Sequence, residues 1–256
     1  MGLFDKKICS ICNKKIGILD LIGSRKLEDG YLCKDCAKRL SPWFSDNRKS
    51  TVEEIREQLS YRELNKEEVE SFNATRTFGQ KYKVMIDDRS NKFLVTKESK
   101  WREENPDVLK FSQVTGCDID IKESKDEMYD RDKDGNQVSF NPPQFSYKYS
   151  FGIVIHVNHK YFSEMKFDVN NTLIIEKVVM KPGFDPKKRE HENDYLECKK
   201  IAEDIKAAIL GIHEEARNAE EEAEKPKAAL VCPFCGATTV PDAAGNCEYC
   251  GACIVR

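Results

Sequence analysis

The sequence has no long apolar run, and no stretch approaches the roughly 20 apolar residues that a membrane-spanning helix needs. The opening residues, MGLFDKKICS, contain neither the apolar core nor the small-residue cleavage site of a secretory signal. They also fail the myristoylation pattern, because Lys6 stands where Ser or Thr is required. We therefore expect a soluble cytoplasmic protein whose cysteines stay reduced.

Motifs of catalysis are lacking as well. The sequence contains no Ser-His-Asp grouping in a known family context, no HExxH helix and no glycine-rich phosphate loop. Its many carboxylates fall in polar helical segments or turns. This pattern favours a protein that is not an enzyme.

A strong excess of charge of either sign is also missing. The net charge of −3 divides into +5 for residues 1–50 (eleven Lys and Arg against six Asp and Glu), −2 for residues 217–256 (four against six) and therefore −6 for the middle. The basic N-terminal segment falls short of the basic stripe that is typical of nucleic-acid-binding domains.

Cysteine, in contrast, is abundant, with eleven residues in the chain. Eight of them form four CxxC pairs, whose two-residue spacing lets a tight turn direct both sulfurs at one metal ion. Four thiolates close the tetrahedral sphere of Zn²⁺ and leave no position for a catalytic water. We predict two structural zinc sites, with ligands Cys9, Cys12, Cys33 and Cys36 in the first and Cys232, Cys235, Cys247 and Cys250 in the second.

The three remaining cysteines are not predicted as ligands. Cys253 forms an overlapping CxxC with Cys250, so an exchange of ligands there stays open. Cys117 and Cys198 are isolated in the sequence and are interpreted as small core residues. Redox chemistry is the lesser alternative for the pairs, since a redox CxxC usually stands alone in a thioredoxin-like pattern.

Residues 1–45 show the element order of a treble-clef zinc finger. The first cysteine pair forms a knuckle, Asp29-Gly30 predicts a hairpin turn, and the second pair opens a short helical stretch that ends at Ser41-Pro42. This order of elements is more informative about the fold than the cysteine spacing alone.

The same segment resembles a known bacterial family. The motif consists of Cys9-x-x-Cys12 with Lys15-Ile-Gly17, then Leu27-x-Asp29-Gly30-Tyr31-x-Cys33-Lys34-Asp35-Cys36, then Leu40-Ser41-Pro42-Trp43-Phe44. It looks like the N-terminal domain of the family catalogued as domain of unknown function 4428, over roughly the first sixty to seventy residues. The resemblance implies an architecture and carries no activity with it.

Residues 46–76 are predicted to be a helical connector of one or two helices. Ser50 and Asn65 each precede a glutamate by three residues, which is the pattern of a capping box. Val52, Ile55 and Leu59 recur at helical spacing and form one narrow apolar face. We interpret the remaining, highly charged face as solvated.

Residues 77–216 are predicted to form an antiparallel β domain with a C-terminal helix. About seven strand patterns are followed by an amphipathic helix that begins after Asn193-Asp194. The strands are expected at residues 82–86, 92–96, 108–111, 114–121, 147–157, 164–169 and 173–179. Seven strands and one closing helix resemble a pleckstrin-homology-like barrel, and the sequence of residues 111–117 is similar to turns in bacterial domains of that kind. A β-sandwich or a split barrel stays open as an alternative.

The C-terminal end is predicted to be a linker, residues 217–230, and a zinc ribbon, residues 231–256. The linker is polar, alanine-rich and interrupted by Pro226. Each ribbon knuckle carries a glycine directly after its second cysteine. The fold class expected for the whole chain is therefore α+β and multidomain.

Two further patterns resemble metal sites. Asp130 to Asn136 matches the first half of a calcium-binding loop, but Asn141 stands where the bidentate glutamate belongs, so we expect an exposed hairpin loop there. His156 and His159 are three residues apart, and residues at that spacing on a strand face opposite sides, so we expect ordinary half-buried or exposed roles for them.

The function expected from these patterns is that of a zinc-binding interaction protein with a protein partner. One alternative is nucleic-acid binding through the basic residues of the first module; the other is membrane-surface binding through lysines of the β domain. The candidates for the first are Lys14, Lys15, Arg25, Lys26, Lys34, Lys38 and Arg39, and for the second Lys81, Lys83, Lys92 and Lys97. The oligomeric state is not indicated.

Overall fold

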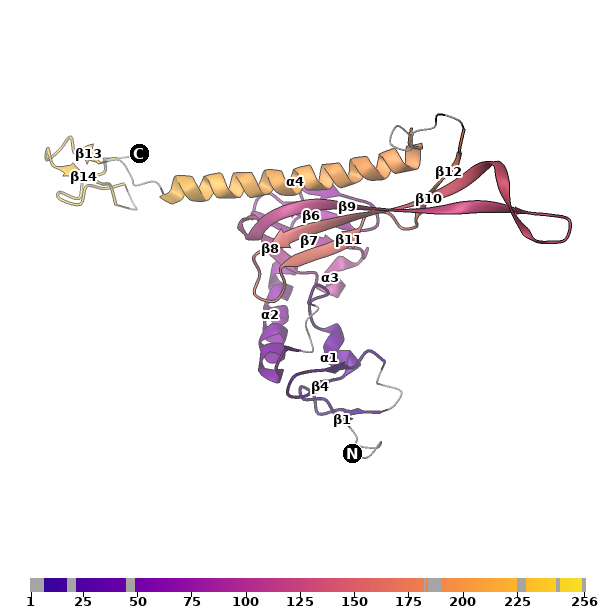
Figure 1. Ribbon diagram of the computed structural model, residues 1–256. Helices are drawn as coiled ribbons and strands as arrows, with labels where there is room; N and C mark the ends of the chain where they lie inside the picture. The colour runs from indigo at the N-terminus through magenta and orange to yellow at the C-terminus, as the bar shows by residue number, and fades with distance from the viewer. Residues whose placement is uncertain are drawn as a thin grey trace. The chain divides into compact units, whose positions relative to one another are not determined.

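The computed structural model describes residues 7–17, 22–44, 49–181, 183, 190–224, 229–242 and 245–254 (Figure 1). The chain mixes helices with antiparallel sheets and divides into two compact units, residues 1–214 and residues 215–256. Across the described residues, no helix is both long enough and apolar enough to cross a membrane.

The first unit begins with two small hairpins and a short helix. Strand β1 (Lys7–Ile8) pairs with β2 (Lys15–Ile16), and β3 (Arg25–Lys26) pairs with β4 (Tyr31–Leu32). Helix α1 (Lys34–Lys38) follows directly. A knuckle, a hairpin and a helix thus occur in the order expected from the sequence.

One continuous helix, α2 (Val52–Ser71), follows. Its N-terminus has a capping box in which Thr51 Oγ1 accepts from the N–H of Glu54 and the Glu54 carboxylate accepts from the N–H of Thr51. The cap predicted at Ser50 is therefore wrong by one residue. The cap predicted at Asn65 is also wrong, because this residue lies in the middle of α2. Its side chain forms hydrogen bonds with the backbone of Pro106 and Val108.

The buried face of α2 is apolar near its N-terminus and mostly polar in its middle. Ile55 and Leu59 are buried in the same core as the first cysteines. Gln58, Arg62 and Asn65 are also buried, although the charged face of this helix was predicted to be solvated. That interpretation is wrong for Arg62, since its charge has a buried partner that lies far away in the sequence.

Four strands form the first sheet of the β domain, in the order β5-β6-β7-β8. They are β5 (Arg76–Phe78), β6 (Lys83–Asp87), β7 (Lys92–Thr96) and β8 (Val108–Lys110), with the short helices α3 (Trp101–Glu104) and η3 (Phe111–Gln113) beside β8. All neighbours are antiparallel. Strand β5 was not predicted.

The second sheet is built on one long strand. Strand β10 (Gln137–Val157) pairs on one side with β9 (Val114–Arg131) and on the other with β11 (Glu164–Asp168) and β12 (Ile174–Val179). Within the described residues neither sheet closes on itself, so the expected closed barrel is not formed.

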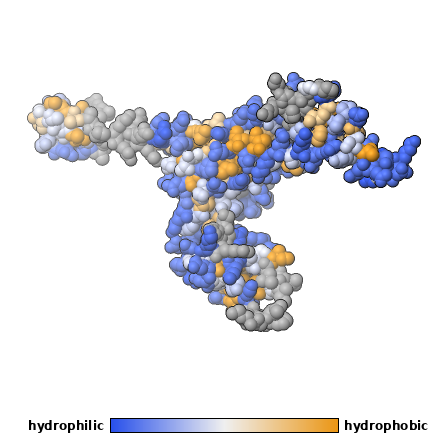
Figure 2. All heavy atoms as spheres, viewed as in Figure 1, coloured by the Kyte–Doolittle hydropathy of each residue, from blue (hydrophilic) through white to orange (hydrophobic). Residues whose placement is uncertain are grey.

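The β9–β10 hairpin extends beyond its neighbours in the sheet (Figure 1). Most side chains of its outer part are exposed, and hydrophilic residues dominate that end (Figure 2). The pairing skips residues 140–143, which form a bulge on β10. The strand predicted at residues 114–121 continues to Arg131, because polar residues on both faces hide the alternation beyond residue 121.

Helix α4 (Asn193–Glu224) starts slightly earlier than predicted, because Asn193 and Asp194 lie in its first turn and do not precede it. It continues past residue 212, where its apolar pattern ends. Its buried face is apolar and recurs every three or four residues, at Ala202, Ile205, Ile209 and Ile212. Tyr195 contacts the rings of Tyr149 and Phe151 edge-on, with centroids 4.8 and 4.9 Å away. These contacts fix the start of α4 against β10.

Candidate metal centres

The four N-terminal cysteines converge as predicted. Their sulfur atoms all lie within 4.8 Å of one another, and the sulfurs of Cys12 and Cys33 are 3.6 Å apart. Four sulfurs at about 2.3 Å from a tetrahedral Zn²⁺ would be about 3.8 Å apart, whereas a disulfide bond is about 2.05 Å long. The arrangement therefore fits one zinc ion.

Backbone hydrogen bonds hold the first knuckle in place. The N–H of Cys9 donates to the carbonyl of Lys14 and the N–H of Asn13 donates to the carbonyl of Cys9, both at 2.9 Å. Asn13 has a φ of 60°, in the left-handed region that Asn tolerates. The N–H of Cys33 then donates to the sulfur of Cys9 at 3.3 Å, which ties the two cysteine pairs together.

The environment of these sulfurs distinguishes their protonation. Burial opposes ionisation of Cys9, but backbone hydrogen bonds from Cys12, Cys33 and Ile11 outweigh it and lower its pKa to about 6. Burial raises the pKa of Cys33 and, together with hydrogen bonds from neighbouring thiols, that of Cys36. Cys9 is therefore the most readily ionised of these three thiols, and ionisation of Cys33 and Cys36 would depend on a bound cation.

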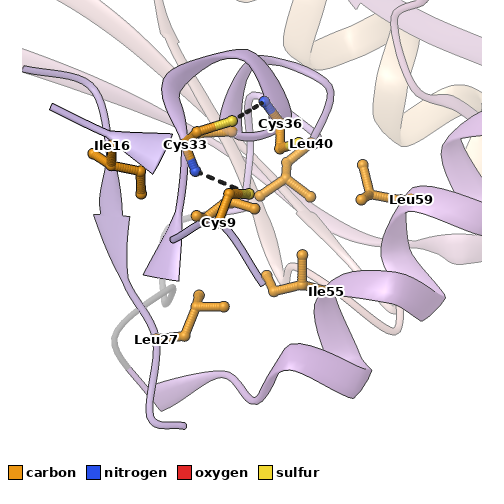
Figure 3. Close-up of a cluster of buried hydrophobic side chains, with 10 residues drawn as sticks. Cys9, Ile16, Leu27, Cys33, Cys36, Leu40, Ile55 and Leu59 are labelled. Atoms are coloured by element: carbon orange, nitrogen blue, oxygen red, sulfur yellow. Dashed lines mark hydrogen bonds between the residues drawn. The ribbon is translucent and has the colours of Figure 1, made fainter. Parts of the chain in front are cut away.

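A small apolar core supports this group. Ile16, Leu27, Leu40, Ile55 and Leu59 are buried around the cysteines, and α2 contributes the last two (Figure 3). A domain of this size buries little apolar surface by itself, so we expect bound metal to supply much of its folding free energy.

The second cysteine group lies in the C-terminal unit. Strands β13 (Leu230–Val231) and β14 (Thr238–Thr239) form a hairpin that carries the first pair. All four sulfurs lie within 4.8 Å of one another, with Cys232 to Cys250 at 3.6 Å and Cys235 to Cys247 at 3.8 Å. These spacings also match a tetrahedral zinc site.

The two C-terminal knuckles have the same backbone geometry. Gly236 donates its N–H to the carbonyl of Cys232 and Gly251 donates its N–H to that of Cys247, at 2.9 and 2.8 Å. The φ angles of the two glycines are 73° and 71°, so the glycine after each pair serves a turn that few other residues can adopt. Cys253 is exposed and lies outside the four-sulfur group.

The C-terminal thiols are also unequal. Burial opposes ionisation of Cys232, but the backbone N–H groups of Cys235 and Phe234 lower its pKa to about 7. For Cys250, the backbone N–H of Ala252 lowers the pKa, but burial and the neighbouring thiols together outweigh this effect and raise the pKa to about 12. Cys232 is therefore more readily ionised than Cys250, and ionisation of Cys250 would depend on a bound cation.

The other sequence candidates do not join a metal cluster. The Asp132 carboxylate accepts from the N–H groups of Asp134 and Asn136, both at 2.9 Å, so it stabilises the exposed turn between β9 and β10. His156 lies 3.0 Å from Asp118, and His159 packs on Phe162. Throughout the described ranges, only the two cysteine groups bring three or more potential ligands together.

Comparison with known proteins gives a family match over the segment that contains the first cysteine group. Residues 7–58 match the sequence model of the family described as Domain of unknown function (DUF4428). No curated protein and no solved structure matches the chain. The match ends inside α2, just after Ile55, which is buried in the cysteine core. The family match and the four-cysteine group therefore fit a zinc-finger-like domain of this family that includes the start of the helix.

Proposed function

We propose that this chain, whose N-terminal zinc-finger-like domain is that of DUF4428, is a non-enzymatic adaptor of the bacterial cytosol. In this proposal a treble-clef finger, a pleckstrin-homology-like domain and a C-terminal zinc ribbon present surfaces to a protein partner. The two zinc ions hold those surfaces in shape.

The number of sulfurs in each group carries the proposal. Each of the two candidate sites has four converging cysteine sulfurs. Four thiolates occupy all the positions of a tetrahedral zinc ion, whereas a catalytic zinc keeps a position for water or substrate. The metal would therefore act on folding, and recognition would fall to the side chains around it.

The contacts between the finger and the β domain support a single composite surface. Ser41, just after α1, donates to the buried carboxylate of Asp107 at 2.8 Å. Arg62 of α2 donates to the same carboxylate at 2.7 Å. A partner that touched both parts would meet a surface that is already ordered, which lowers the entropic cost of binding.

The element order supports the pleckstrin-homology-like assignment. A four-stranded antiparallel sheet precedes a second antiparallel sheet, and an amphipathic helix then packs on it through Tyr195. Antiparallel strands followed by one packed helix agree with the order that the resemblance implies, although the strands lie in two open sheets.

Capture from the native bacterium tests the adaptor proposal. The tagged chain and a Cys33→Ser variant are cross-linked in cells, and bound proteins are identified by mass spectrometry with and without nuclease. Cys198→Ser, which lies outside both cysteine groups, is the matched control. We expect a protein partner that resists nuclease, persists with Cys198→Ser and is lost with Cys33→Ser.

The same experiment separates the alternatives. Capture that disappears with nuclease would support nucleic-acid binding, and recovery of lipid without protein would support a membrane surface. Ion pairs weigh against both, because Lys14 lies 2.9 Å from Asp35, Arg39 lies 3.1 Å from Glu63, and Lys92 pairs with Glu68.

A further inference from the structure

A groove of about 430 Å³ lies where the zinc-finger-like domain meets the first sheet. We call it the Trp43 groove. Its floor includes the buried residues Leu40 and Val95, and its walls include Trp43 and Tyr82. A second hollow of about 500 Å³ shares Pro42, Trp43 and Lys166 with it. Each hollow is large enough to hold a short segment of a ligand.

Trp43 is fixed in position but lacks a hydrogen-bond acceptor. Its ring and that of Tyr82 both pack on the buried ring of Phe167, with centroid distances of 6.4 and 5.3 Å. Among the described residues, nothing accepts a hydrogen bond from its buried indole N–H. A buried donor without an acceptor is costly, and a ligand oxygen placed there would remove that cost.

The charged rim of the groove is positive. It has four cations, Arg25, Lys38, Lys97 and Lys166, against the carboxylates Glu98 and Glu104. Arg62 also lines the groove, but its charge is neutralised by Asp107.

Some of the rim charge is already compensated. Lys97 lies 4.0 Å from Glu98, and Lys166 lies 3.6 Å from Asp120. In the part of the chain that the structure describes, neither Arg25 nor Lys38 has an ion-pair partner. Asp35 interacts with Lys38 only through a longer-range Coulombic attraction. Two cations without a direct ion pair beside a half-apolar groove favour a ligand that carries both carboxylates and apolar side chains.

We infer that the Trp43 groove binds an extended acidic peptide segment of the partner; this rests on the proposed adaptor function. The apolar floor takes the apolar side chains, a peptide carbonyl accepts from the Trp43 indole, and carboxylates meet Arg25 and Lys38. Nucleic acid fits less well, because Glu98 and Glu104 on the rim would repel a run of phosphates.

Selection from a random dodecamer peptide library on the zinc-loaded chain tests the inference. We expect peptides rich in Asp and Glu with interspersed apolar residues. In a Trp101→Phe background Trp43 is the sole tryptophan, so the emission of that residue should shift when a selected peptide binds.

Variants then locate the binding site. By fluorescence anisotropy we expect Trp43→Phe, which keeps a ring but removes the N–H, to weaken the selected peptide roughly 3- to 10-fold, the usual effect of one hydrogen bond. Lys38→Glu should weaken it by about tenfold or more. Lys133→Glu, a matched charge reversal at the exposed hairpin turn, should have no effect.

The inference is overturned if no peptide is enriched, if the enriched peptides are basic or uncharged, or if they bind Lys38→Glu and Trp43→Phe like the wild type. An oligonucleotide that competes for the groove better than any peptide would also overturn it. Cross-linked partner capture that survives in these variants would show that the groove inference fails while the adaptor proposal stands.

Discussion

Arg62 Nη1 lies 2.7 Å from Asp107 Oδ1, and both side chains are buried. The same carboxylate accepts from Ser41 at 2.8 Å and from the hydroxyl of Tyr61 at 3.2 Å. Asp107, in the segment before β8, therefore links the segment just after α1 to helix α2. These hydrogen bonds supply the partners that a buried ion pair needs.

Removal of this carboxylate should be strongly destabilising. In Asp107→Ala the guanidinium of Arg62 stays buried without its counter-ion, which costs about 3–5 kcal/mol. We expect the free energy of unfolding of the zinc-loaded protein to fall by that amount in urea titrations followed by fluorescence.

Asp88→Ala is the matched control for Asp107→Ala. Asp88 pairs with Arg76, but both side chains are about two-fifths exposed, so this ion pair should contribute only about 0–1 kcal/mol. Equal losses of stability in the two variants would contradict the role given to Asp107.

Packing from α2 should influence how tightly the first zinc is held. Ile55 is fully buried beside the cysteines, and Ile55→Ala should cost about 2–5 kcal/mol. We also expect the first site to release zinc faster to a chromogenic chelator. Leu64→Ala, on the exposed face of the same helix, should change neither the stability nor the rate of zinc release. A rate of zinc release in Ile55→Ala equal to that of the wild type would show that packing from α2 does not influence the first site.

Acid should weaken the fold partly through Asp87. Burial opposes ionisation of this carboxyl, but hydrogen bonds from the N–H groups of Asn73, Ser90 and Arg89 outweigh it and hold its pKa below the usual value. Because the folded-state pKa is depressed, the carboxylate stabilises the fold above about pH 4, and this contribution is lost as the pH falls further.

A thermal series of wild type and Asp87→Asn measures this contribution. The variant should melt at a lower temperature at pH 7, and the difference in Tm should shrink below about pH 4. Loss of zinc in acid affects both proteins alike and cancels in the difference. A constant difference from pH 7 to pH 3 would show that ionisation of Asp87 contributes nothing.

Local patterns predicted what depends on nearby residues. The spacing of Cys9 and Cys12 fixes a knuckle, because the turn between them is made by its own backbone. The same holds for the turn at Asp29-Gly30, where the N–H of Leu27 donates to the carbonyl of Gly30. The alternation within β11 likewise reveals which face is buried.

Partnerships between distant residues could not be predicted in this way. Asn65 looks like a helix cap, yet its side chain donates to the carbonyl of Pro106 and accepts from the N–H of Val108. Arg62 looks solvated until Asp107 is placed beside it. The Trp43 groove was missed for the same reason, since its walls come from segments that only the fold brings together.

Zinc content of the purified chain, measured by atomic emission, is the direct test of the two metal sites. We expect two zinc ions per chain in the wild type, one in Cys33→Ser and one in Cys247→Ser, since each change removes one of four ligands from a separate group. A wild-type content well below two, or variants that both keep two ions, would contradict it.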